Sequence, residues 1–166
     1  MALAFRERRD VVERREPAEL RKVYESVRGG GVIVLWVSRH VPVPIQFRVL
    51  EEKLGPITIY QLSGIVPSAE YVMEKAREVG AKYIVPVLPL SIIARLAELA
   101  PREGITVLIS KMDNIAVVRS WEEAERIVNE KPEARTIATY ADGLIRVFEF
   151  KQFEKLKEVK LVTEPL

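Results

Sequence analysis

The strongest candidates for a functional site in this sequence are three adjacent polar residues, Ser38, Arg39 and His40. They directly follow the apolar run Val32–Val37, and His40 is the only histidine of the chain. An arginine can hold a phosphate through two parallel hydrogen bonds, and a histidine can exchange a proton near neutral pH. We therefore expect Arg39 to bind an anion, and we treat Ser38 and His40 as candidate catalytic residues. In the alternative interpretation, His40 is an ordinary surface histidine and Arg39 pairs with an acid on a neighbouring helix.

Other polar residues follow the later apolar runs of the chain in the same way. These candidate ligand-binding residues are Ser63, Gly64, Ser91, Ser110, Lys111 and Asn114. The set is rich in hydroxyl groups and net basic, and helices begin close to it, so an anionic ligand is favoured. The serines could instead serve only to cap the turns that follow them.

The elements that must position these residues alternate between strand and helix. We predict strands at Val32–Val37, Ile57–Leu62, Tyr83–Leu88 and Ile105–Ile109. We predict helices at Pro17–Val27, at Pro44–Leu54, between Ser68 and Gly80, at Leu90–Ala100 and after the Ser120 capping box. Apolar strands that alternate with helices are typical of a parallel sheet covered on both faces. The predicted fold is therefore a Rossmann-like or flavodoxin-like α/β domain of strand order 2-1-3-4, in which a ligand binds where the carboxyl ends of the strands meet.

The carboxyl-terminal third changes from this alternation to a period of two. Arg135–Tyr140 and Leu144–Phe150 flank a turn at Asp142-Gly143 and predict a β-hairpin. Glu158–Thr163 predicts a further strand, and Ala116–Val118 could add a short one. We expect one domain in three parts, which are a charged arm and helix (1–31), the α/β core (32–131) and a hairpin extension (132–166).

Composition argues against several classes of protein. The net charge of +2 gives no field that would draw the chain to nucleic acid, so that partner is not expected. There is no cysteine, which removes disulfides and thiolate chemistry, and a single histidine argues against a zinc site. No apolar stretch reaches the roughly 18 residues of a membrane span, so we expect a cytoplasmic protein without a membrane partner. Many Glu, Lys and Arg residues and ten prolines are typical of a thermophile.

Residues 1–16 are rich in arginine and glutamate, and their secondary structure is left open by the sequence. They could form a basic arm that contacts nucleic acid or a partner subunit. Because acids nearly match bases in this segment, we interpret it instead as a charge-balanced surface.

Motifs for the commonest ligands of such a fold are missing. No G-x-G-x-x-G follows the first strand, and no G-x-x-x-x-G-K-[ST] occurs, which argues against a dinucleotide site and a P-loop. Asp113 is the only acid close to a predicted strand end, so a magnesium site built from several carboxylates is not supported. We therefore expect no metal and no cofactor.

In topology and size, residues 32–130 resemble the CRISPR-associated Rossmann-fold (CARF) domains and the small ring nucleases built from them. The matching positions are Ser38 and Arg39 after the first strand and Ser110 and Lys111 after the fourth. The resemblance implies that the chain binds a cyclic oligoadenylate across a dimer, through the loops after those strands. It also implies that cleavage of the ligand could proceed without a metal.

Two hypotheses of different classes follow. In the first, the protein is a cytoplasmic homodimer that binds an anionic ligand, a nucleotide above all, and could cleave a phosphodiester without metal. In the second, it is a non-enzymatic self-assembling or regulatory protein, of viral or plasmid origin. The helix Leu90–Ala100 is apolar nearly all round, so we expect it to be more buried than its neighbours, in the core or in a subunit interface.

Overall fold

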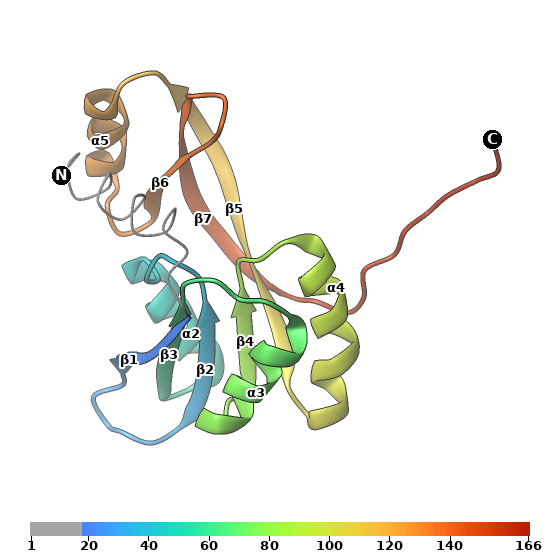
Figure 1. Ribbon diagram of the computed structural model, residues 1–166. Helices are drawn as coiled ribbons and strands as arrows, with labels where there is room; N and C mark the ends of the chain where they lie inside the picture. Colours follow the sequence, from blue (N-terminus) through green and yellow to red (C-terminus); the bar gives the residue numbers. More distant parts are fainter. Residues whose placement is uncertain (1–17) are drawn as a thin grey trace.

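A computed structural model describes residues 18–166, which form a mixed α/β fold around one curled sheet of seven strands (Figure 1). In chain order the elements are β1 (Glu19–Glu25), β2 (Val32–Val37), α2 (Pro44–Leu54), β3 (Ile57–Ser63), α3 (Ala69–Val79), β4 (Tyr83–Pro86), α4 (Leu90–Leu99), the 3-10 helix η1 (Ala100–Glu103), β5 (Thr106–Val118), α5 (Trp121–Glu130), β6 (Arg135–Thr139) and β7 (Ile145–Lys155). The predicted helices from residue 44 onward and the predicted hairpin are confirmed.

The predicted α/β class is confirmed, but the sheet is mixed and is not a purely parallel Rossmann-like sheet. Strands β3, β2, β4 and β5 run parallel, whereas β1 pairs antiparallel with β3 at one end and β7 and β6 continue antiparallel at the other. The four parallel strands are neighbours in the middle of the sheet. The order of the whole sheet, β1-β3-β2-β4-β5-β7-β6, differs from the predicted four-stranded order because antiparallel strands extend it on both sides.

Helices cover both faces of the parallel part. Helix α2 covers one face, where Trp36 is buried as part of the core. Helices α3 and α4 cover the other face (Figure 1). Four side chains of α3 are buried but only Leu96 of α4, so the alternative that buries α4 in the core of its own chain is wrong, and burial in a subunit interface stays a prediction. Its apolar residues instead leave an exposed side, on which Leu90 is 66% exposed.

The segment predicted as the helix Pro17–Val27 is instead the edge strand β1. Its apolar residues are spaced by three and four, as in a helix. They fit a strand because the register shifts between Lys22 and Tyr24, as in a β-bulge. Leu20 therefore packs on the α3 side of the sheet, whereas Val23 and Tyr24 pack on the α2 side. The bulge thus imitates a helical period. Residues 1–16, for which the sequence left the structure open, lie outside the described residues.

Strand β5 is much longer than the predicted strand Ile105–Ile109. It has 13 residues and includes the short strand that the sequence suggested at Ala116–Val118. The polar stretch between these two segments remains extended because it pairs with β7 from Leu108 to Val118, with register irregularities after Lys111 and Asn114. Nonlocal backbone hydrogen bonds therefore override a local sequence that is typical of a turn.

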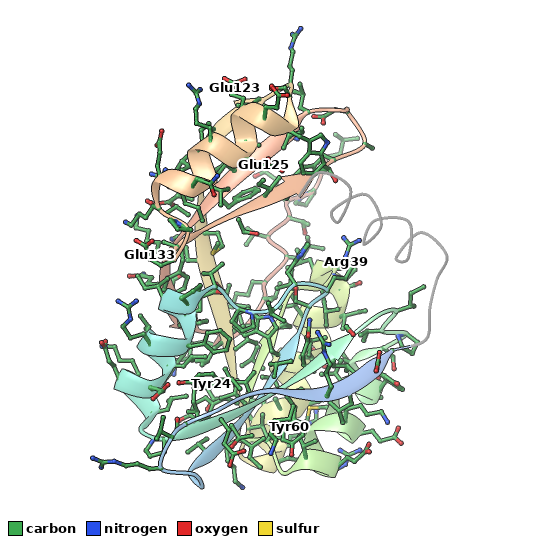
Figure 2. The ribbon with its side chains drawn as sticks, turned by 90° about the vertical axis from the view of Figure 1, so that its left-hand side faces the viewer. Tyr24, Arg39, Tyr60, Glu123, Glu125 and Glu133 are labelled. Atoms are coloured by element: carbon green, nitrogen blue, oxygen red, sulfur yellow. The ribbon has the colours of Figure 1, made fainter. Side chains whose placement is uncertain are left out.

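The end of the sheet formed by β5, β6 and β7 has a small hydrophobic core of its own. Helix α5, whose first turn is capped by the Ser120 hydroxyl on the Glu123 N–H at 3.3 Å, packs on β5, β6 and β7. Figure 2 shows α5 and the hairpin at one end of the molecule and the parallel part at the other. The strand predicted at Glu158–Thr163 is absent from the described structure, and the chain leaves the body after β7 (Figure 1).

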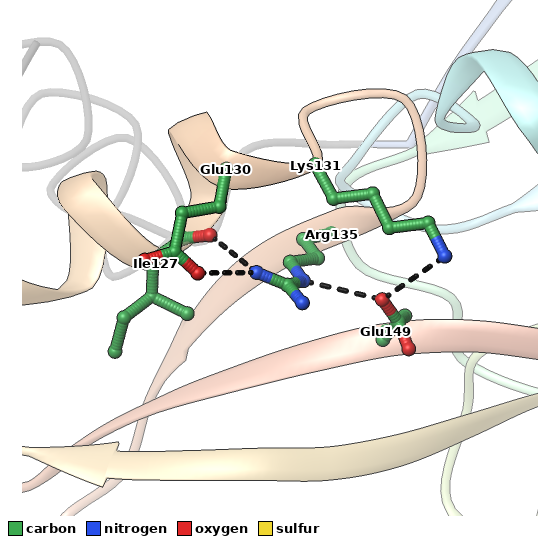
Figure 3. Close-up of polar contacts among 5 residues, drawn as sticks. All are labelled: Ile127, Glu130, Lys131, Arg135 and Glu149. Atoms are coloured by element: carbon green, nitrogen blue, oxygen red, sulfur yellow. Dashed lines mark hydrogen bonds and ion pairs between the residues drawn. The ribbon is translucent and has the colours of Figure 1, made fainter.

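Arg135 ties the end of α5 to strand β7 (Figure 3). Its guanidinium donates to the Ile127 carbonyl at 2.8 Å and to Glu130 at 3.2 Å, and its Nε donates to Glu149 at 3.2 Å. Lys131 Nζ lies 3.4 Å from the same Glu149 oxygen. The hydrogen bond from Arg135, and then the charge of Lys131, hold the pKa of Glu149 below its ordinary value.

We expect the stabilising effect of Glu149 to be lost in acid. A carboxyl whose pKa is lower in the folded state than in the unfolded chain stabilises the fold above its unfolded pKa of about 4.3. That stability disappears as the pH falls through the lower, folded pKa. In urea denaturation, Glu149→Gln should therefore be less stable than the wild type at neutral pH, and the two should converge once the pH falls below the lowered pKa of Glu149.

The matched control is Glu154→Gln in the same strand, because Glu154 is exposed and its nearest cation, Lys111, lies 3.9 Å away. Its effect should be much smaller at every pH. A stability difference between wild type and Glu149→Gln that does not vary with pH would contradict the role given to this ion pair.

Candidate functional site

Three neighbouring parallel strands, β3, β2 and β4, end at the same edge of the sheet, which we call the carboxyl edge. Val37 at the end of β2 pairs with Leu62 of β3 and with Pro86 of β4. The residues that follow, which include Ser38 and Ser63, are therefore brought together. This is the position at which ligands bind in open parallel sheets.

The turn formed by Ser38, Arg39 and His40, which we call the 38–40 turn, is held by two buried side chains. The Trp36 indole N–H donates to the His40 carbonyl at 2.9 Å, and the Gln61 amide donates to the Ser38 carbonyl at 2.8 Å. Trp36 is 3% exposed and Gln61 is 1% exposed. The carbonyls on either side of Arg39 are thus fixed from inside the protein, so the backbone that presents Arg39 is preorganised.

Gln61 is a functional candidate that the sequence reasoning missed. Its side-chain oxygen accepts hydrogen bonds from Arg21 of β1, with Nε at 3.4 Å and Nη2 at 3.2 Å. A buried amide is costly unless its groups are paired, and here both its oxygen and its nitrogen have partners. The available signal was a glutamine inside the otherwise apolar end of a strand.

Arg39 is exposed at the tip of this turn, at the level between the parallel part and α5 (Figure 2). Within residues 18–166, no hydrogen bond or ion pair of its guanidinium is found. The interpretation in which Arg39 pairs with an acid on a neighbouring helix thus has no support in that part of the chain. Arg95, by comparison, lies 3.0 Å from Glu70. An exposed arginine without an acid beside it can give its full charge to a ligand.

Ser38 has a structural role in the same turn. Its hydroxyl oxygen accepts a hydrogen bond from the His40 backbone N–H at 3.2 Å, as in the turn-capping alternative left open by the sequence. The His40 side chain is exposed. A catalytic role for Ser38 or His40 stays a prediction.

Ser63, Gly64 and Ser91 lie at or after the carboxyl ends of β3 and β4, the strands that flank β2. Ser63 is the last residue of β3, and Gly64 has a φ of +92°, a conformation that favours glycine. Ser91 is exposed near the start of α4, and no side chain caps the first turn of that helix. The carboxyl edge therefore combines hydroxyl groups with a helix start.

Ser110 does not belong to a strand end, because β5 continues past it. Its hydroxyl accepts a hydrogen bond from the Gln46 amide at 2.9 Å. Gln46 is only 4% exposed, and its oxygen accepts from the Val43 N–H at 2.7 Å at the start of α2. Gln46, which the sequence reasoning also missed, therefore joins α2 to the long strand β5.

Lys111 and Asn114 also lie inside β5 and not in a loop. Lys111 is exposed, 3.9 Å from Glu154 of β7. The Asn114 amide, oriented to satisfy its neighbours, donates to the Ala116 carbonyl at 2.9 Å. The prediction that a strand ends just before these residues is wrong, because it placed them by local polarity alone.

Four exposed apolar side chains also occur at the carboxyl edge, and we call them the apolar rim. They are Val41 after β2, Ile65 after β3, and Val87 and Leu90 after β4, with exposed fractions of 46%, 44%, 60% and 66%. They share one edge of the sheet, and exposed apolar surface often marks a region that contacts another molecule.

A shallow open hollow lies elsewhere, between β1 and α2. Its walls include Tyr24 and Phe47, whose rings stack with centroids 4.5 Å apart, and the charged residues Arg48, Glu51 and Glu52. The aromatic rings pack on each other and on the core, so we assign the hollow no site.

The described part of the chain holds neither a cluster of metal-ligating side chains nor a helix that could span a membrane. Within it, no group of three or more His, Asp or Glu side chains could hold a metal ion. None of its helices has the length and apolar character that crossing a bilayer requires. No protein-family model, curated protein or solved structure matches this chain.

Proposed function

We propose that the protein binds an anionic ligand of the nucleotide class at its carboxyl edge, with Arg39 holding a phosphate. The observation that carries this proposal is the 38–40 turn itself. Two buried side chains, Trp36 and Gln61, bond its carbonyls, and the arginine at its tip has no acid partner within residues 18–166. A preorganised arginine can form two parallel hydrogen bonds to a phosphate with little loss of entropy.

The surroundings of Arg39 favour the same ligand chemistry. Ser63 and Ser91 supply hydroxyl groups, and α3 and α4 begin near the same edge with the positive ends of their dipoles. Ser110 and Lys111, which the resemblance to CARF domains brought into the ligand site, are placed differently. Because they lie inside β5, the proposed site rests on the turn and its neighbours alone.

Cleavage of a bound phosphodiester would be a second property of the same turn. In this extended form of the proposal, Ser38 and His40 orient or polarise the ligand without a metal. Incubating cyclic and linear oligonucleotides with the protein in the presence of a chelator, followed by chromatography, tests cleavage separately from binding.

Thermal denaturation in the presence of mononucleotides, dinucleotides and cyclic oligonucleotides tests the binding. A ligand at about a hundred times its dissociation constant should stabilise the protein by about 2.7 kcal/mol. Arg39→Ala should weaken the binding by about 10- to 100-fold, because a hydrogen bond to a charged group contributes about 1.5–3 kcal/mol.

The matched control is Arg102→Ala, which removes another exposed arginine, in η1. This variant should bind as the wild type does. The proposal fails if no nucleotide raises the melting temperature, or if the Arg39 and Arg102 variants bind equally well.

The second candidate is self-association, which the apolar rim favours. Val87 and Leu90 are more than half exposed and lie close together in the chain at the start of α4. Burying such residues against a second copy would stabilise a homodimer by the hydrophobic effect. A protein that sediments as a monomer at micromolar concentration would contradict this candidate.

A further inference from the structure

We propose that residues 157–166 form an exchange arm that binds the apolar rim of a second copy of this chain. The proposal rests on the second candidate function, self-association, and names the segment and the surface that would carry it.

The arm leaves the body of the protein at the end of β7. The Leu156 N–H donates to the Val107 carbonyl at 2.9 Å, and the Leu156 side chain packs on the core. The following residues turn outward and extend past α4 (Figure 1). Leu161 and Val162 are 92% and 88% exposed, and Leu166 is fully exposed at the terminus.

The sequence of the arm is that of a strand. In an extended chain Val159, Leu161 and Thr163 share one face, and the apolar Val162 lies among the charged residues of the other face. The described structure gives this segment no strand partner. A β-forming, apolar segment without a partner in its own body is suited to binding another chain.

The apolar rim is the surface on a second copy that fits the arm best. The arm leaves its own body beside α4, and Val87 and Leu90 lie at the start of that helix (Figure 1). Because the arm and the Val87 and Leu90 part of the rim both adjoin α4, a two-fold axis there lets each arm reach the other copy's rim. Ten extended residues span about 33 Å, which is enough to cross such an interface.

The charges of the arm do not oppose this contact. Its side chains comprise two lysines and two glutamates, and Lys160 lies 3.3 Å from Glu158. The arm therefore brings no excess of one sign to an apolar surface. Two copies related by symmetry would not repel each other through their arms.

Sedimentation velocity of the full chain, with Leu161→Gln and its control Glu164→Gln, tests the exchange. The wild type should be a dimer at micromolar concentration. Leu161→Gln should raise the dissociation constant of the dimer by about 100-fold or more, because each dimer loses two buried leucines. Glu164→Gln, on the opposite face of the arm, should leave it unchanged. Since Leu161 is 92% exposed in the single chain, its replacement leaves the monomer's fold intact, which circular dichroism checks.

Mixing two defective variants gives a sharper test. Leu90→Gln should also be a monomer, because it damages the rim. When it is mixed with Leu161→Gln, the intact arm of one variant meets the intact rim of the other, so heterodimers should form. A simple hydrophobic contact between two rims would not be restored in this way.

Each other outcome has a definite meaning. A monomeric wild type overturns both the exchange and self-association. If Leu161→Gln stays a dimer while Leu90→Gln does not, the rim associates without the arm, and the exchange alone is overturned. Nucleotide binding by monomeric Leu161→Gln, followed by its melting temperature, decides the ligand proposal independently.

Discussion

Replacing Gly31 with alanine is expected to lower the free energy of unfolding by about 3 kcal/mol or more. Gly31 has a φ of +86°, a region that side chains rarely adopt. A Cβ at this position would lie 2.0 Å from the Pro56 carbonyl oxygen, which is backbone and cannot move away as a flexible side chain could. The strain of the left-handed conformation and the steric clash therefore add.

The clash lies where β2 begins beside β3, so the loss of stability should not be confined to the turn. The same Pro56 oxygen accepts a hydrogen bond from the Val32 N–H at 3.0 Å, where β2 begins beside β3. An alanine would push apart the first residues of two central strands. Urea denaturation measures the loss as a fall in the transition midpoint.

Gly30→Ala is the matched control. Gly30 also has a positive φ, +64°, but an added Cβ would meet nothing within 4 Å. Its cost should be only the conformational one, about 1–2 kcal/mol. If the two alanine variants lose equal stability, the close approach to Pro56 does not have the effect that we assign to it.

Gln61→Ala is the second change with a large expected effect, about 3 kcal/mol of stability. It removes one of the largest fully buried side chains and leaves a cavity beneath the carboxyl edge. It also leaves the partly buried Ser38 carbonyl without the partner that it has in the wild type, whereas the exposed Arg21 guanidinium can bind water instead. A lost hydrogen bond that leaves a buried group unpaired costs more than the bond itself contributes.

The same change should weaken ligand binding by about tenfold, because the 38–40 turn would then have to be ordered on binding. Gln152→Ala, an identical substitution at an exposed position of β7, should alter stability by less than about 0.5 kcal/mol and leave binding unchanged. Normal nucleotide affinity in a folded Gln61→Ala protein would show that the 38–40 turn does not need the hydrogen bond from Gln61 in order to bind the ligand.

Local patterns were enough to predict the helices that bury one face and the turns that carry their own signals. Ser68 accepts from the Tyr71 N–H, and the Ser120 hydroxyl caps α5 in the same way. Asp142 accepts from the Leu144 N–H in the hairpin turn. In each case the deciding hydrogen bond joins residues two or three apart, so it can be read from spacing alone.

The predictions that failed depended on a distant partner. The helix expected before Val27 is an edge strand because β3 offers it hydrogen bonds and a bulge accommodates its spacing. The polar residues after Ile109 remain in β5 because β7 lies beside them. Glu158–Thr163, which has the pattern of a strand, pairs with no strand of residues 18–166.

The candidate site divides along the same line. The sequence by itself determined that Ser38, Arg39 and His40 follow a buried strand, since an apolar run and its polar end are local properties. That Gln61 and Trp36 hold this turn, and that Ser110 and Lys111 lie inside a strand, became clear only from the folded chain. The physical reason is that pairing between strands and the burial of polar groups join residues far apart in the chain. The polar groups that need a hydrogen-bond partner can be recognised in the sequence. Which residue becomes that partner depends on the fold.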